Sequence, residues 1–571
     1  MLILGDISGI HQFVTNVAHV GGGQAKRLRA RSFFVQALCD AAAVKLLHGL
    51  SCESLDETHL LMAAAGHFIL RVEDRPGLEP ILEQHSAEMN GWLLSELSGE
   101  IRLSLAWARD GGTEMEQFLR ARRQLSHSAL RPWASIAMKG GSWNVGKLML
   151  APLDTPCQLC RERPGEVPET DDDSGEERTI CRLCDSLKAL GGALTQASWL
   201  EIVASDAARP AASASVSAFG LRVALYRGAA MPPRSPSTLG VADLAGQVPH
   251  GTEGPYPGKM LPRVLARYVP TSPGPNGSTL DLRSIAKKST GDHKLGVLKA
   301  DGDGMGEFWS SIFETDQDLN RYRAKSREFD DFSAREINQM LVDADAQKSP
   351  RRYVYTVFSG GDDLLFVGPW DIILEFAGVV SQRFRERFAE DGLTISAGVG
   401  IIRPGWPIRR AAQLAEDLLH QAKSAVAGAA PGDQIAALGQ VWKWADHESI
   451  LEEGKRWASW VQDRVLDRGW LQRLRELNEA QDGRRNRTIG PNTVDRTAQM
   501  MASARLSYSI DRLVKSSSRI RDCKPLRDRL HHLTREFETR ETTRARYLSA
   551  SLLYASMSTR TPSAEDRDDM A

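Results

Sequence analysis

Four aspartates lie in two glycine-rich turns of this 571-residue chain. Asp301 and Asp303 follow an apolar run in the sequence Asp-Gly-Asp-Gly, and Asp362 and Asp363 end a Ser-Gly-Gly-Asp-Asp sequence. Hard cations such as Mg²⁺ or Mn²⁺ prefer oxygen ligands, and a nucleotide polymerase site needs carboxylates from two adjacent strands to hold metals against a triphosphate. The pattern therefore predicts that Asp301, Asp362 and Asp363 are catalytic metal ligands.

The residues around these acids are suited to binding a nucleotide. Gly360 and Gly361 carry no side chain where the backbone must approach the nucleotide, and Asp303 lies in an equally open turn. Lys423, on the polar side of a helix predicted over 411–425, can reach a β- or γ-phosphate as a point charge. Two alternatives stay open, because solvated β-turns also prefer Asp and Gly, and a lysine on a helix is often merely solvated.

Four of the seven cysteines form two Cys-x-x-Cys pairs. Cys157 and Cys160 are separated by 20 residues from Cys181 and Cys184. This spacing suits a four-thiolate zinc ribbon with a closed coordination shell, so the zinc would be structural rather than catalytic. Four free thiols are the alternative.

The acids need strands to position them, and the sequence predicts those strands in residues 291–430. An apolar strand ends at Asp301, a hairpin-like pair of strands surrounds Gly361, and a third strand follows over 393–400. A helical stretch is predicted between the first strand and the hairpin. The two acid turns would then belong to one compact segment.

Residues 1–150 repeat this order of strand, helix and paired strands. Asp6 and Gly66 are 60 positions apart, and so are Asp301 and Gly361. We interpret the match as an internal duplication. In the first copy, a histidine and a phenylalanine follow the glycine in place of the last two acids.

Composition and charge limit the class of protein. Hydrophobic residues make up 42% and charged residues 25% of the chain, as in ordinary soluble globular proteins. No apolar run is long enough to span a bilayer and no export signal is present, so we expect a cytoplasmic protein. Residues 451–560 contain 23 Lys and Arg against 14 Asp and Glu, and such a basic face could meet RNA or an acidic protein partner.

Two further groups of residues allow more than one interpretation. The basic run from Lys26 to Arg31 lies on a predicted helix, where it could contact phosphates or be a solvated face. The tryptophans between Trp442 and Trp470 are expected to be core residues of a helical bundle. Partner contact is the better interpretation for Arg484, Arg485 and Arg487.

In combination, these motifs resemble the large subunit (Cas ten) family of type III CRISPR effector complexes, and its Csm-type branch more than its Cmr-type branch. The segments that carry the resemblance run along most of the chain. They are Gly5–Ile10, Ala25–Phe33, the two Cys-x-x-Cys pairs, Leu298–Asp303 and Ser359–Asp363.

The resemblance implies an α+β multidomain fold with two ferredoxin-like, nucleotide-cyclase-like palm domains. Its domains would be a degenerate first palm without metals (1–150), a zinc ribbon (151–190), a loop-rich linking domain (191–290), a second palm with the Gly-Gly-Asp-Asp motif (291–430), a C-terminal helical domain (431–558) and a disordered tail (559–571).

The resemblance also implies an activity and partners. The chain would synthesise cyclic oligoadenylate from ATP when its complex captures a target RNA. Asp362, Asp363 and Asp301 match the family's metal acids, and Ser359 and Lys423 fall where nucleotide contacts are expected. The implied partners are guide RNA, target RNA and the other effector subunits, namely the backbone subunit, the small subunit and the subunit that binds the guide 5′ handle.

The sequence departs from the family at one point and leaves two rivals open. Many members begin with an HD nuclease domain, whereas here the first palm strand begins at Leu2 and no His-Asp dipeptide occurs. We therefore expect no DNA cleavage. The rivals are a diguanylate-cyclase-like enzyme, although Leu364 stands where that class usually has Phe, and a catalytically silent scaffold subunit.

Overall fold

The chain forms two compact units in the computed structural model. The first unit comprises Met1–Asp281, Gly304–Phe366 and Gly405–Ala412, and the second comprises Leu282–Asp303, Val367–Pro404 and Gln413–Ala571. The structure describes residues 1–15, 23–52, 59–64, 66–131, 133–139, 142–149, 153–171, 175–204, 212–228, 235, 237–246, 259–261, 263–272, 278–424, 432–481, 496–539 and 542–560.

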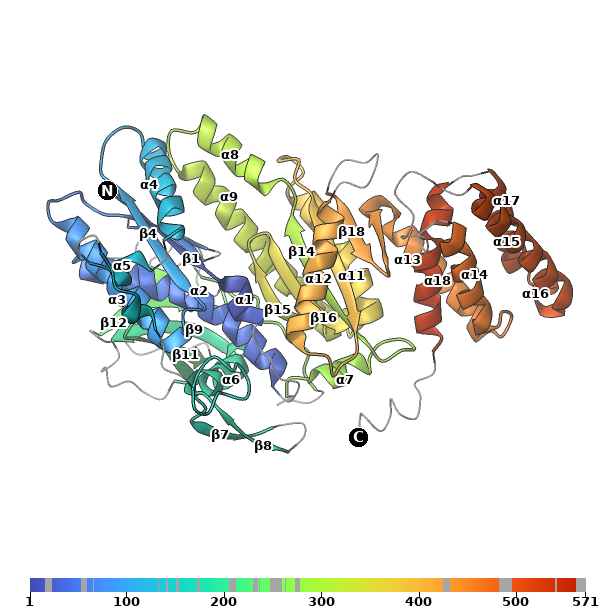
Figure 1. Ribbon diagram of the computed structural model, residues 1–571, viewed down its shortest axis with the longest axis horizontal. Coiled ribbons are helices and arrows are strands. Elements are labelled where there is room, and N and C mark those ends of the chain that lie inside the picture. Colours follow the sequence, from blue (N-terminus) through green and yellow to red (C-terminus); the bar gives the residue numbers. More distant parts are fainter. Residues whose placement is uncertain are drawn as a thin grey trace. The chain divides into compact units, whose positions relative to one another are not determined.

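A four-stranded antiparallel sheet begins the first unit (Figure 1). Its strand order is β2-β3-β1-β4, as expected for the strands predicted in residues 1–150. The register sets Asp6 of β1 opposite His67 of β3 on one side and opposite Ser104 of β4 on the other. The strands are β1 (Leu2–Ser8), β2 (Leu60–Ala64), β3 (His67–Arg71) and β4 (Arg102–Ala108).

Helix α2 (Gln24–Gly49) is the most deeply buried helix beside this sheet, with 19 of its 26 residues buried. A helix that is covered on nearly every side must contact several elements at once, and α2 contacts β1, β2, β3 and two elements described below, α6 and β15. The sheet is flanked by α1 (Ile10–Thr15), α3 (Leu78–Leu97) and α4 (Glu114–Ala129). Thr113 and Glu116 form a capping box that starts α4.

The cysteine segment is a small hairpin followed by a helix. The hairpin pairs β7 (Val167–Thr170) with β8 (Glu177–Ile180), and α6 (Arg182–Leu194) follows. Short elements precede it, namely α5 (Ala134–Ala137), β5 (Met138–Lys139), β6 (Ser142–Trp143) and the 3₁₀ turn Val145–Leu148.

Residues 191–290 contain more regular structure than predicted. A five-stranded sheet of order β10-β11-β9-β12-β13 occupies this region, where the Pro, Gly and Ser content had favoured loops. Short apolar runs such as residues 223–226 in β11 outweigh that composition, because these strands are buried on both faces. The strands are β9 (Ala197–Ala204), β10 (Ala214–Ala218), β11 (Leu221–Arg227), β12 (Thr238–Asp243) and β13 (Met260–Leu261).

A second sheet repeats the topology of the first one. Its order is β15-β16-β14-β17-β18-β19, and the first four positions correspond to β2-β3-β1-β4. The register also repeats, since Asp301 of β14 lies opposite Ser396 of β17 as Asp6 lies opposite Ser104. The strands are β14 (Leu295–Gly302), β15 (Tyr355–Gly360), β16 (Asp363–Pro369), β17 (Ile395–Ile402), β18 (Gln434–Ala437) and β19 (Gln440–Lys443).

The helices that connect these strands include an unusual wide turn. A π-helix over Asp331–Glu336 joins α9 (Asn320–Asp330) to α10 (Ile337–Ala346). Single π turns inside α-helices are rare and often occur at functional sites. The remaining helices are α7 (Leu282–Ala286), α8 (Met305–Thr315), the 3₁₀ turn Pro350–Tyr353, α11 (Trp370–Arg387) and α12 (Ile408–Lys423).

The C-terminal part of the second unit is helical and is built around tryptophan and leucine, as predicted. Trp457 and Trp460 are buried in one cluster with leucines of α14, α15, α17 and α18. Residues 434–443, predicted to belong to this helical domain, instead form β18 and β19. The helices are α13 (Trp444–Gln462), α14 (Arg468–Gln481), α15 (Arg496–Ser516), α16 (Ser518–Asp522), α17 (Lys524–Thr539) and α18 (Thr542–Ser558).

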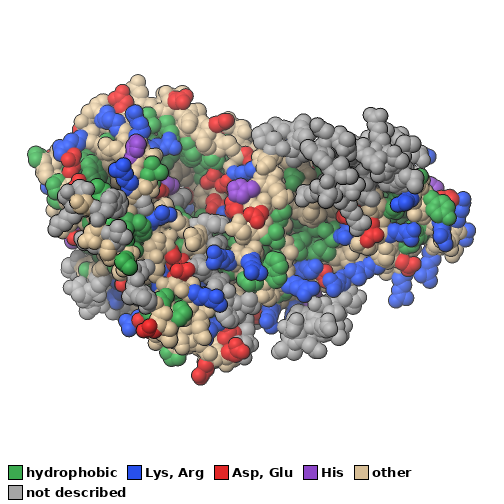
Figure 2. Space-filling model, viewed as in Figure 1, with side chains coloured by type: hydrophobic (Ala, Val, Ile, Leu, Met, Phe, Trp, Pro, Cys, Tyr) green, Lys and Arg blue, Asp and Glu red, His purple; other side chains and the backbone are tan. Residues whose placement is uncertain are grey.

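Basic side chains gather on these helices (Figure 2). Exposed examples on α15 to α17 are Arg505, Arg512, Lys515, Arg519, Arg521 and Lys524. The three arginines at 484, 485 and 487 and the tail beyond residue 560 lie outside the described residues. Among the helices that the structure describes, none is long and apolar enough to cross a membrane.

His447 is a buried polar residue where α13 packs on α11. Its Nδ1 accepts a hydrogen bond from Trp442 Nε1 at 3.2 Å, and its Nε2 lies 2.9 Å from the carbonyl oxygen of Leu374. Both ring nitrogens are therefore satisfied when the ring is neutral with its proton on Nε2. Burial lowers the pKa of His447 to about 4.

We predict that acid destabilises the second unit through His447. A histidine in the unfolded chain has a pKa of about 6.5, so between that value and the folded pKa the unfolded chain binds the extra proton. The free energy of unfolding then falls by about 3 kcal/mol over the whole interval, of which about 2 kcal/mol is lost between about pH 7 and about pH 5. Urea unfolding followed by tryptophan fluorescence at these two pH values measures the loss. His447→Gln should flatten it, whereas His531→Gln on an exposed surface should not.

Candidate active site and metal centre

Asp301 and Lys423 form an ion pair at the end of β14 in the second unit. Lys423 Nζ donates to Asp301 Oδ2 and to the carbonyl oxygen of Gly302, the latter at 2.8 Å. The side chains of Asp301 and Lys423 are 33% and 29% exposed, so the pair is open to solvent. Lys423 is the last residue of α12, and this helix approaches β17 closely. A Cβ atom on Gly398 would lie 2.2 Å from the carbonyl oxygen of Ala415.

The Asp303 carboxylate is fully engaged with the protein. It accepts hydrogen bonds from Thr394 Oγ1 at 2.8 Å, Ser396 Oγ at 2.7 Å and the backbone N–H of Asp433 at 2.8 Å. Gly432, with φ of +77°, packs against the same carboxyl group, where a Cβ atom would come within 2.8 Å of its Cγ. Asp303 therefore holds the turn after β14 in place, and this contact pattern favours positioning over direct nucleotide binding.

The Gly-Gly-Asp-Asp turn joins β15 and β16 in the first unit. Gly361 has φ of +62°, a left-handed conformation that glycine adopts at least cost. Ser359 Oγ donates to the carbonyl oxygen of Ser333 in the π-helix at 2.8 Å, so its hydroxyl group faces protein. Asp362 and Asp363 are half-buried.

The predicted site residues therefore form two groups. Asp301, Asp303 and Lys423 lie together in the second unit, and residues 359–363 form one turn in the first unit. Convergence of the two groups on shared metals and one nucleotide is a prediction from sequence, and it belongs to the proposed function.

The first sheet has a different pair at the corresponding place. His67 Nδ1 lies 2.9 Å from Asp6 Oδ1, directly across the strand register. In the first sheet, a histidine of β3 contacts the acid of β1. In the second sheet, the turn that contains Asp362 occupies the corresponding place in the strand order. That the first copy holds no catalytic metals stays a prediction from sequence.

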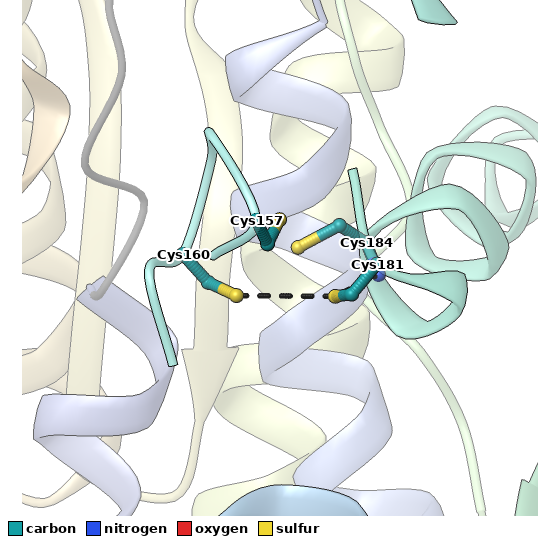
Figure 3. Close-up of side chains that lie close together, drawn as sticks. All are labelled: Cys157, Cys160, Cys181 and Cys184. Carbon is teal, nitrogen blue, oxygen red and sulfur yellow. Dashed lines mark hydrogen bonds between the residues drawn. The ribbon is translucent and has the colours of Figure 1, made fainter. Parts of the chain in front are cut away.

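The four paired cysteines lie together in a buried cluster (Figure 3). Their sulfur atoms lie within 4.8 Å of one another, and Cys160 Sγ and Cys181 Sγ are 3.8 Å apart. Hydrogen bonds from the other thiols, that of Cys160 first, lower the pKa of Cys157. Four converging sulfur atoms are the donor set of a structural zinc site, so the cluster could bind zinc.

Positive groups next to the sulfur atoms support this fit. Arg163 Nη1 lies 3.5 Å from Cys160 Sγ, and Arg31 Nη2 lies 4.0 Å from Cys184 Sγ. The backbone N–H of Cys184 also points to Cys181 Sγ at 3.4 Å. Four thiolates around Zn²⁺ carry net negative charge, and neighbouring cations and N–H donors offset such charge.

The structure contradicts both roles that were predicted for the arginines of the basic run on α2. Arg27, Arg29 and Arg31 are only 1–3% exposed, so they form neither a solvated face nor an open phosphate site. Arg27 pairs with Glu169 and donates from Nε to the carbonyl oxygen of Cys184 at 3.4 Å. Arg31 donates to the carbonyl oxygen of Phe13 at 2.6 Å and lies over its ring. No local pattern indicates Glu169 and Cys184 as partners, because they lie 142 and 157 positions along the chain from Arg27.

Sequence reasoning also missed a residue that holds the Gly-Gly-Asp-Asp turn. The carbonyl oxygen of Ser333 in the π-helix accepts the hydrogen bond from Ser359 Oγ. Ser333 lies in no recognisable motif, and the local feature nearest to it is the acidic pair Asp330-Asp331 inside an otherwise helical pattern.

Two protein-family models match the chain. The second palm domain of Cas10/Cmr2 matches residues 294–428, which include both acid turns and Lys423. Domain B of the Csm1 subunit matches residues 1–131, which include the first sheet.

Curated relatives match about three quarters of the chain. The CRISPR system single-strand-specific deoxyribonuclease Cas10/Csm1 (subtype III-A) of Thermococcus onnurineus is 27% identical over 444 residues, which cover 74% of this chain and 53% of that protein. The protein of the same name from Mycobacterium tuberculosis is 25% identical over 452 residues, which cover 73% and 52%. This chain spans about half the length of the curated relatives it matches.

Solved structures share the fold over nearly the whole chain. A Csm1-Csm4 cassette in complex with cA4 has a TM-score of 0.67 at 20% identity, covering 98% of this chain and 70% of that chain. A Csm1-Csm4 cassette in complex with one ATP gives the same values. The repeated sheets have the fold of the solved Csm1 chains. Residues 1–131 and 294–428 match domain models of the Cas10 family, and over about three quarters of its length the chain is similar to Csm-type members of that family.

We predict that the purified chain contains about one zinc ion held by the four cysteines. Cys181→Ser should lower the zinc content at least about fivefold and lower the thermal stability of the first unit, because a structural metal contributes folding free energy. Elemental analysis by mass spectrometry measures the metal. Cys523→Ser, a cysteine outside the cluster, is the matched control and should leave the zinc content unchanged. Equal zinc in both variants would contradict the assignment.

Proposed function

We propose that this chain synthesises cyclic oligoadenylate from ATP when its complex captures a target RNA. The observation that carries the proposal is the repeated sheet, whose second copy has Asp301 at the end of β14 and the Gly-Gly-Asp-Asp turn between β15 and β16. The fold-related Csm1-Csm4 cassettes are in complex with one ATP, pppApA, pppApApA and cA4. These ligands are a triphosphate, linear adenylates and cA4, as expected for the substrate, the intermediates and the product of one adenylate-forming reaction.

The acids would supply the metal site of this reaction. Asp301, Asp362 and Asp363 would hold Mg²⁺ or Mn²⁺, which when bound favours attack of a ribose hydroxyl group on an α-phosphate and offsets the charge of the leaving pyrophosphate. Asp303 keeps the first turn in place through its three hydrogen bonds. Ser359, Gly360 and Gly361 would form the nucleotide-facing backbone of the second turn.

Lys423 would act in two ways. In the structure it neutralises the Asp301 carboxylate and binds the carbonyl oxygen of Gly302. With metal bound at Asp301, the ammonium group on its flexible stem would be able to contact a β- or γ-phosphate as a point charge. Lys423 would thus neutralise Asp301 in the empty site and bind the polyphosphate in the loaded one.

The partners follow from the family. Csm4 accompanies Csm1 in the fold-related cassettes, and we propose that this chain likewise assembles with guide RNA, target RNA and the other effector subunits. The cysteine cluster, with zinc bound, would stabilise the first unit and take no part in the chemistry. The exposed basic residues of α15 to α17 provide a surface for an acidic partner.

We predict that Asp362→Ala with Asp363→Ala abolishes product formation. The assembled complex, incubated with labelled ATP and Mg²⁺ or Mn²⁺ with and without target RNA, should form cyclic adenylates only with target RNA. Loss of two metal ligands should lower the rate at least about a hundredfold, as measured by mass spectrometry. Asp343→Ala with Asp345→Ala removes two exposed acids from α10 and should leave the rate unchanged.

Two other outcomes of the same assay would favour the alternative functions. A cyclic dinucleotide from GTP would favour the diguanylate-cyclase-like enzyme, and no product in a complex that binds its target would favour the scaffold. The curated relatives are named deoxyribonucleases, whereas the expected lack of that activity here stays a prediction from sequence. Incubation of the same complex with single-stranded DNA tests it.

A further inference from the structure

Lys299 is a buried lysine two residues before Asp301 on β14, and the chemistry described so far gives it no role. Its side chain is 10% exposed, and its Nζ lies 3.9 Å from Oε2 of Glu416 on α12. The other carboxylate oxygen of Glu416 lies 3.4 Å from Nε2 of the exposed His420. Buried ion pairs add little stability compared with apolar side chains of similar volume, and their best-attested role is to specify how two elements align.

Two ion pairs of opposite polarity connect β14 to α12. Lys299 of the strand faces Glu416 of the helix, and Asp301 of the strand faces Lys423 of the helix. The two strand residues point to the same face of the sheet, about 7 Å apart. The two helix residues are seven positions apart, which is about two turns or 10 Å. Because the charges alternate, a shift of α12 along β14 in either direction would bring charges of like sign together.

The backbones of α12 and β17 come into contact beside Lys299. The register pairs Lys299 with Gly398 of β17, where a Cβ atom would lie 2.2 Å from the carbonyl oxygen of Ala415. Gly400 also faces the helix, at Leu414. Glycines give the strand a smooth surface with no side chains to fit into the grooves of a helix. This contact therefore sets the distance between helix and strand but not the position of the helix along the strand, which the ion pairs can set.

The first sheet has an apolar residue at the corresponding place. Leu4 stands two residues before Asp6 on β1, as Lys299 stands two residues before Asp301 on β14. Leu4 is buried in an apolar cluster with Phe118 of α4. The place is thus apolar in the copy whose acid pairs with a histidine of its own sheet, and ionic in the copy whose acid pairs with a lysine of a helix. The ion pair accompanies the helix lysine.

We propose that Lys299 and Glu416 are positioning residues for Lys423. Their ion pair sets where α12 lies along β14, and the end of the helix then delivers the Lys423 ammonium group to Asp301 and to the carbonyl oxygen of Gly302. The proposal rests on the proposed function in that Lys423 binds the polyphosphate of ATP. Lys299 and Glu416 would act through Lys423 and not by contact with ATP.

The test measures KM for ATP and kcat of the assembled complex with target RNA and Mg²⁺. We expect Glu416→Gln and Lys299→Met each to raise KM for ATP about tenfold, because small misplacement of a binding group has effects of this size. Lys299→Arg retains the charge and should restore most of the wild-type KM. In a chain that already carries Lys423→Met, Glu416→Gln should change KM less than about twofold, because residues that act through one group are not additive.

Lys455→Met is the matched control. Lys455 forms an ion pair with Glu375 at 2.5 Å in the same unit, and its side chain is 51% exposed. The same chemical change at this position should leave KM for ATP and kcat as they are in the wild type. If Glu416→Gln behaves like Lys455→Met, or if its effect is as large with Lys423→Met as without it, the proposal is wrong.

A second measurement does not depend on catalysis. Hydrogen exchange in peptides covering 413–424 should be about tenfold faster in Glu416→Gln than in the wild type, with exchange in α13 unchanged. If the wild-type complex makes no adenylates yet this exchange changes, the proposed function fails and the positioning role stands. If the complex is active and exchange over 413–424 is the same in both, the positioning role fails alone. If Lys299→Met exchanges fast throughout the chain and is therefore unfolded, Glu416→Gln, whose side chain is 21% exposed in the wild type, decides.

Discussion

Burial of charged side chains on α2 is the constraint on which the first unit depends. A guanidinium removed from water is costly unless it finds partners. Arg27 and Arg31 contact the segment of the cysteine cluster, whereas both Nη atoms of Arg29 are buried without a hydrogen-bond partner among the described residues. Helix α2 also packs against β15. Asp40, further along the same helix, binds Arg263. One helix thereby links the cysteine cluster, the first sheet and the strand that leads to the Gly-Gly-Asp-Asp turn.

The two sheets show how one topology can support different chemistry. Asp6 and Asp301 occupy the same place in strand order and register, opposite Ser104 and Ser396. In the first copy the acid is satisfied by a histidine of its own sheet. In the second copy it is paired with a lysine at the end of a helix. The same position in the topology therefore has a neighbour in the strand register as its partner in one copy and a lysine from a helix in the other.

Features that depend on neighbouring residues could be predicted from the sequence. Features that depend on residues far along the chain could not. The acid turns, the cysteine pairs and the duplication are local patterns, and the strands predicted around them are present. The burial of Arg27 and Arg31 involves Glu169 and Cys184, which are more than a hundred residues away along the chain, and no local pattern encodes such partners. The sheet over 197–261 differs from the loops that its composition favours, because short apolar strands buried on both faces lie between the Pro-, Gly- and Ser-rich segments.

The close approach of α12 to β17 has a consequence for comparing related sequences. At Gly398 even a methyl group would collide with the helix backbone and displace the residue that ends it, Lys423. The register makes Ala106 the counterpart of Gly398 in the first sheet, where no lysine has to be delivered to an acid. In genome surveys, a side chain at this position would mark copies that have lost the catalytic arrangement even when all four aspartates remain.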